Sequence, residues 1–158
     1  GRIVLWGGDV EMGRLTLERT TIQTGVPLEK RLSTAYRAVA FAIGGGMIRA
    51  RVPSVNRNTG GRGSGEPGFS DARVARPTQD SYEDVLNRVP APSGDAFWLD
   101  VRNPPSDKAG GWLRGPRQMR LISGLYSPVV PGAFETTIEL PANFDAIVFV
   151  KVPTPAHQ

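Results

Sequence analysis

The sequence predicts an α/β fold, with a mixed, largely parallel sheet of about five or six strands, two or three helices and a long Gly/Arg-rich loop. Short apolar runs recur from the first residues to the last, which is typical of buried strands. Amphipathic stretches separate several of these runs, and strands that alternate with helices favour parallel neighbours. The 158 residues, with 19 Gly and 14 Pro, suit one turn-rich domain that can bury a real core. We therefore expect residues 1–158 to form a single domain.

The first half is expected to contain three strands and one helix. Residues 2–6 carry four apolar residues in a row and predict a buried strand that stops at a glycine pair. A short amphipathic helix is expected over residues 27–33. Residues 36–43 predict a buried strand, and residues 47–52, where apolar residues and arginines mix, predict a half-exposed one. The three glycines between these two strands favour a hairpin, although they would also let a backbone approach a ligand closely.

A long exposed loop is expected over residues 53–77, which consist mainly of Gly, Asn, Arg and Ser. Residues 63–68 fit the spacing G-x-G-x-x-G. No helix pattern follows them, so a dinucleotide site is not expected there.

The second half is expected to begin with the most secure helix, over residues 81–89. Its predicted capping box places Asp80 at the N-cap and lets Glu83 reach back to it. An apolar run follows at residues 97–101. Residues 144–152 predict a final strand, and because only two charged residues interrupt its apolar character, we expect it to be buried in the sheet.

Composition excludes several functions. The net charge is +4, but the 19 basic residues are spread among 15 acids, so the clustered basic face of a nucleic-acid-binding protein is not expected. There is no cysteine, which excludes thiol chemistry and disulfides. The one histidine, His157, is next to last, so neither a Ser-His-Asp triad nor a His-rich metal site is available. We predict no metal and no cofactor.

The sequence also lacks the signs of a membrane or secreted protein. No apolar run approaches the roughly 20 residues of a membrane span, and the first residues lack the order of a signal peptide. The compartment stays open, with a soluble, cytoplasmic protein slightly favoured. Since the chain begins almost inside a predicted strand, we expect a fragment or a processed product.

Several separated phrases resemble the C-terminal part of the erythromycin esterase family, hydrolases that open the lactone ring of macrolide antibiotics. The phrases are residues 2–6, 28–41, 81–83, 97–102, 112–113, 116–120 and 144–149. Among them are Phe-Trp-Leu-Asp-Val-Arg and Phe-Asp-Ala-Ile-Val-Phe, which resemble two strands of the family. The order and spacing of the phrases cover nearly the whole chain, and the resemblance implies carboxylic ester hydrolysis.

Two departures from the family put that activity in doubt. The family's opening strand runs into Trp-Ala-His-Asn-x-His, whose histidines belong to the active site. Here Trp6 is kept, but Gly8 and Glu11 stand where the histidines would be, and Asp9 replaces the asparagine. A glycine cannot carry a proton in catalysis. The N-terminal half of the family, which the resemblance gives a further catalytic His and Glu, is absent from these 158 residues.

Two functions therefore stay open. The first is a degenerate family member that does not catalyse by itself and serves as a binding, structural or assembly subunit. Its partner would be a missing N-terminal half, a second chain or another copy, because a fragment leaves a sheet edge or face uncovered. The second is one half of a split or cleaved hydrolase that acts on an ester or lactone. Asp9 and Glu11 would then be its catalytic pair, since two carboxylates can divide acid and base roles.

Candidate ligand-binding residues accompany these acids. They are Trp6, Gly8, Arg102 and Arg117. Together with Arg120, the two arginines could clamp a carboxylate or phosphate beside the strand ends. Ordinary pairing with nearby acids is the favoured interpretation. Those acids are Asp100, Asp107 and Glu135.

Overall fold

The computed structural model describes residues 2–14, 24–52, 68–90 and 94–155. These residues confirm the α/β class. The helices are α1 (Asp9–Met12), α2 (Gly25–Leu32), α3 (Tyr82–Arg88), α4 (Lys108–Arg114) and α5 (Leu140–Asn143), with 3-10 turns η1 (Ser33–Ala35) and η2 (Pro131–Phe134). The strands are β1 (Val39–Ile43), β2 (Met47–Val52), β3 (Gly68–Arg73), β4 (Ala96–Asp100), β5 (Arg117–Arg120), β6 (Glu135–Ile138) and β7 (Ala146–Val150).

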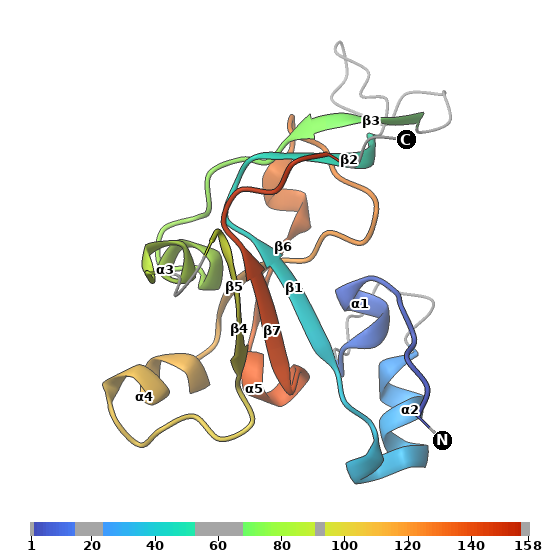
Figure 1. Cartoon of the computed structure of the whole chain (residues 1–158), viewed down its shortest axis with the longest axis vertical. Coiled ribbons are helices and arrows are strands. Elements are labelled where there is room, and N and C mark those ends of the chain that lie inside the picture. The colour runs from blue at the N-terminus through green and yellow to red at the C-terminus, as the bar shows by residue number, and fades with distance from the viewer. Residues whose placement is uncertain (1, 15–23, 53–67, 91–93, 156–158) are drawn as a thin grey trace.

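The strands form three small sheets in place of the one larger sheet that was expected (Figure 1). The main sheet has the order β1-β7-β4, in which β1 runs parallel and β4 antiparallel to β7. The pairs β2–β3 and β5–β6 are antiparallel ribbons. Among the described residues, β1–β7 is thus the one parallel pair, because the chain leaves the main sheet after β1 and returns to it only at β4 and β7.

The glycines after β1 do not make the expected hairpin, since β1 and β2 belong to different sheets. Gly44 N–H donates to Val150 O at 2.9 Å and so continues the ladder between β1 and β7. Gly46 has a φ of +87°, and a Cβ there would lie 2.7 Å from Pro153 O. The positive φ and the close approach to Pro153 at Gly46 both favour glycine. A hairpin would have paired the two strands with each other. The glycines instead lead the chain from the main sheet into the β2–β3 ribbon.

The opening residues 2–6 are neither buried nor a strand, which corrects the prediction. Ile3 and Val4 are 87% and 88% exposed. The nearest strand, β1, is an edge strand of the main sheet, and on its free edge Phe41 N–H donates to the Asp9 carboxylate at 3.0 Å. The Asp9 side chain therefore takes a backbone N–H that a further strand would need for pairing with β1.

Residues 68–73 form β3, so the exposed loop predicted over residues 53–77 extends too far; residues 53–67, with most of the G-x-G-x-x-G match, lie outside the described residues. β3 forms because β2 offers it a complete partner, from Met47 opposite Arg73 to Val52 opposite Gly68. Their small core contains Ala50, Ala72 and Tyr126.

Helix α3 confirms the predicted helix, but its cap differs. Ser81 is the N-cap, and its Oγ accepts a hydrogen bond from Asp84 N at 3.1 Å. Asp80 lies one residue earlier with a φ of +61°. Glu83 does not reach back; it is buried and accepts a bond from Arg120 N at 2.6 Å. The acid that was expected to complete the cap therefore joins α3 to β5.

Helix α4 was not predicted, because a Gly pair in its middle weakens the helical pattern. Asp107 caps it by accepting a bond from Gly110 N at 2.9 Å. Gly110 packs so closely on the preceding turn that a Cβ would lie 1.6 Å from Pro105 O. The glycine is needed for this approach.

The core lies on one face of the main sheet. Ile147 and Phe149 of β7 are fully buried, as expected for its central place, together with Ala40 of β1. Tyr82 and Leu86 of α3, Leu113 of α4 and Leu140 of α5 pack into the same cluster. None of the helices in the described ranges has the length and apolar character needed to cross a membrane.

Replacing Gly110 with alanine should destabilise the protein by about 1–3 kcal/mol, because the new methyl group must displace the Pro105 backbone. Gly111 is the matched control, since a Cβ there meets nothing within 4 Å. Gly111→Ala should be neutral or stabilising by about 0.5–1 kcal/mol, because alanine favours the helix. Urea denaturation of both variants measures the difference. Equal effects would contradict the packing described for α4.

Candidate functional site

Helix α1 carries both predicted catalytic acids. It begins directly after Gly8, whose carbonyl accepts bonds from Glu11 N and Met12 N, each at 3.0 Å. The helix lies beside the free edge of β1 (Figure 1). Asp9 and Glu11 thus stand on a helical turn, whereas on a continued strand they would have shared one face.

Asp9 is turned into the protein and is only 5% exposed. Its Oδ1 accepts the bond from Phe41 N, whereas its buried Oδ2 has no hydrogen-bond partner. Burial raises the pKa of Asp9 from 3.8 to about 7; the Phe41 bond opposes this rise, and the charges of Glu11 and Glu83 add to it. The carboxyl group therefore joins α1 to β1 and holds a proton much of the time at neutral pH.

Glu11 occupies the space above Gly8. A Cβ on Gly8 would lie 2.3 Å from Glu11 Oε2 and 2.2 Å from Ser123 Cβ, and the Ser123 Cα lies within 2.9 Å. Glu11 Oε2 is itself buried without a hydrogen-bond partner. Position 8, which the resemblance aligns with a family histidine, thus has no room for any side chain unless the Ser123 backbone moves.

Trp6 lies outside this turn. It is 81% exposed, and its ring centroid is 5.0 Å from that of Phe41. Trp6 and Asp9 therefore both contact Phe41 of β1. Trp6 packs on the Phe41 ring, whereas Asp9 accepts a hydrogen bond from the Phe41 backbone.

The candidate arginines do not join the acids of α1. Arg102 forms an exposed ion pair with Asp100 at the end of β4, and this pair lowers the pKa of Asp100 to about 2. Arg117 lies over the Trp112 ring at 4.8 Å and donates to the Trp112 carbonyl. The sequence interpretation favoured pairing with a nearby acid, which Arg102 shows, whereas Arg117 contacts Trp112 instead.

Arg120 is buried, and its Nη2 lies 3.6 Å from Glu135 Oε1. Two of the three acids named as partners for the arginines, Asp100 and Glu135, do pair with them. The third, Asp107, caps α4.

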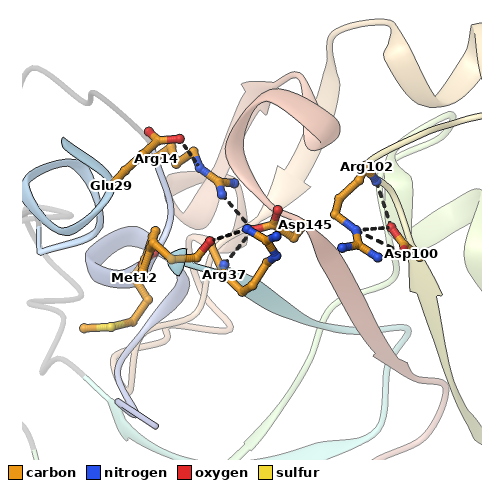
Figure 2. Close-up of polar contacts among 9 residues, drawn as sticks. Met12, Arg14, Glu29, Arg37, Asp100, Arg102 and Asp145 are labelled. Carbon is orange, nitrogen blue, oxygen red and sulfur yellow. Dashed lines mark hydrogen bonds and ion pairs between the residues drawn. The ribbon is translucent and has the colours of Figure 1, made fainter. Parts of the chain in front are cut away.

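A second polar cluster was missed by the sequence interpretation (Figure 2). Asp145 Oδ2 accepts bonds from Ala38 N at 2.8 Å and from Arg14 Nη2 at 2.7 Å. Arg14 Nε also forms an ion pair with Glu29 of α2 at 2.6 Å, and the Tyr36 hydroxyl donates to Met12 O. The signal for this cluster was Asp145 itself, a single acid at the start of an apolar strand.

Comparison with known families identifies the fold. The family model described as erythromycin esterase matches residues 1–152. The chain belongs to the erythromycin esterase family. The resemblance inferred from the separated sequence phrases is thereby confirmed. No curated protein sequence matches the chain.

Solved structures share the fold at low sequence identity. A succinoglycan biosynthesis protein has a TM-score of 0.69 and 16% identity, with 91% of this chain and 31% of that chain covered. A protein from Bacillus cereus has a TM-score of 0.66 and 17% identity, with coverages of 95% and 34%. A mutant of the erythromycin esterase EreC in its open conformation has a TM-score of 0.51 and 20% identity, with coverages of 91% and 30%. The chain thus spans about a third of the length of these structures.

Asp9→Asn should make stability less dependent on pH. Because the folded pKa of Asp9 lies above its unfolded value of 3.8, its contribution to stability is complete below about pH 4 and is lost as the pH rises through about 7. The asparagine amide oxygen can still accept the Phe41 bond but has no charge to bury. The variant should therefore match the parent at pH 4 and exceed it at pH 8, by up to roughly 4 kcal/mol.

Urea unfolding at both pH values gives the difference. Asp71→Asn, which alters an exposed carboxylate paired with Arg49, is the control and should show no such gain at pH 8. An equal free energy difference between Asp9→Asn and the parent at both pH values would contradict the burial of Asp9.

Proposed function

We propose that residues 1–158 form a single-domain, non-catalytic part of an erythromycin-esterase-like protein, with a structural and assembly role. The observation that carries this proposal is the closed position at Gly8, where Glu11 and Ser123 fill the space that a histidine side chain would need. A general base must reach the proton it removes. Neither the residue type nor the local space supports such a base at this position.

The bonding of Asp9 supports the same conclusion. One oxygen of its carboxyl group binds the backbone of β1, and the other is buried. An ester carbonyl would have to enter the interface between α1 and β1 to reach it. The acid therefore acts in this fold as a link between two elements.

One observation favours the alternative, a half of a split or cleaved hydrolase that acts on an ester or lactone. The pKa of Asp9 is about 7, and Glu11 is one of the charges that raise it. A carboxyl group that titrates near neutral pH is suited to general acid–base catalysis. In this alternative α1 would move away from β1 to expose Asp9, and Glu11 would be the second acid.

Hydrolysis of p-nitrophenyl acetate and of a macrolide lactone distinguishes the two. Whatever rate the natively isolated protein shows, Glu11→Gln should leave kcat/KM unchanged, as should the control Glu139→Gln at an exposed site. Gly8→His should not raise the rate, because the new side chain has no space. A fall of about 10²–10⁴-fold in Glu11→Gln alone, the usual contribution of a general acid or base, would establish the hydrolase alternative.

A further inference from the structure

The main sheet is apolar on both faces, although the described residues cover only one. On the covered face, Ala40 and Ile147 stand in register with Leu99, and the next row on this face contains Phe149 and Phe97. Helices α3, α4 and α5 contribute residues to the core on this face.

The opposite face has a central row of Phe41, Val148 and Trp98, which stand in register across the three strands. Trp98 is 69% exposed and Phe41 is 43% exposed. The flanking rows are also apolar except at one corner, where Asp100 pairs with Arg102. Side chains that would be buried in a finished sheet are therefore in contact with solvent.

The opening residues extend this surface. Trp6 lies against Phe41, and it follows the exposed Ile3 and Val4. We call the combined surface the open apolar face. Its main residues are Trp6, Val39, Phe41, Ile43, Trp98 and Val148.

The sequence of the strands indicates that this face is meant to be covered. β1 and β7 read as continuous apolar runs, Val-Ala-Phe-Ala-Ile and Ala-Ile-Val-Phe-Val, which are typical of strands buried on both sides. Three strands of five residues present an area of about 17 Å by about 14 Å. Exposed aromatic and apolar side chains gathered on one sheet face are the composition found at the centre of protein interfaces.

The related structures indicate what covers it. Each contains this fold as about a third of a longer chain, so about two thirds of an esterase-like chain lies outside the match. Faces of sheets with parallel strands are covered by helices in α/β proteins. We propose that helices from that remaining part of an esterase-like chain, on the same polypeptide or on a separate one, pack on the open apolar face. This inference rests on the assembly role proposed above and specifies its surface.

A photoreactive benzophenone side chain at position 98, in the protein as natively isolated, tests the occupant of this face. After irradiation, sequencing of the cross-linked peptide by mass spectrometry should identify an esterase-like segment beyond residues 1–158, with an apolar helical pattern. The same group at position 69 is the control, because Phe69 is 61% exposed on β3, outside the main sheet. Cross-links to a second copy of residues 1–158 would overturn the proposal, as would no cross-linking above the control.

A second measurement covers the case in which the bulky probe disturbs the site. Trp98→Glu should release the covering chain, or lower the unfolding temperature where both parts share one polypeptide; Phe69→Glu should do neither. No difference between the two variants would overturn the proposal. The hydrolysis assay tests the role of Glu11, whereas the cross-linking and Trp98→Glu experiments test the open apolar face. The proposed surface and the non-catalytic role can therefore fail independently of each other.

Discussion

One aspartate at the start of β7 holds the main sheet and the N-terminal helices together. Asp145 N–H donates to Ala38 O at 2.7 Å, and Asp145 O accepts from Val101 N at 3.0 Å, so its backbone joins the flanks of β1 and β4. Its carboxylate binds Ala38 N and the Arg14 guanidinium, which in turn pairs with Glu29 (Figure 2). Hydrogen bonds to charged, half-buried groups are stronger than those between neutral groups. Asp145 thereby fixes Arg14, which follows α1, while the bond from Phe41 N–H to Asp9 joins α1 itself to β1.

The local pattern of the sequence was sufficient for the elements that form from their own residues. The apolar runs of β1 and β7 and the amphipathic pattern of α3 predicted these elements before any partner was known. Elements that depend on distant partners were missed. β3 is polar and forms because β2 pairs with it along its whole length. Helix α4 contains two glycines that weaken its pattern, and only the contact between Gly110 and Pro105 explains one of them.

The site illustrates the same limit. The resemblance implied that Gly8 and Glu11 stand where the family has histidines, and that implied loss put catalysis in doubt. It could not show that the Glu11 carboxylate and Ser123 fill the space over Gly8. On a continued strand Asp9 and Glu11 would have shared one face, whereas the helical turn directs Asp9 into the protein. A carboxylate that would be a catalytic candidate in solvent has become a link between two elements.

The open apolar face is the surface on which we propose that the rest of an esterase-like fold packs. Its strands have the composition of a sheet covered on both sides, and the described residues supply the cover for one. Burial of apolar surface is the main driving force for association, so the uncovered face favours a partner.

Native mass spectrometry of the natively isolated protein tests this account most directly. We expect residues 1–158 to occur with further esterase-like sequence, in one polypeptide or in a stable complex. A stable species containing residues 1–158 alone, as a monomer with the open apolar face in solvent, would contradict it.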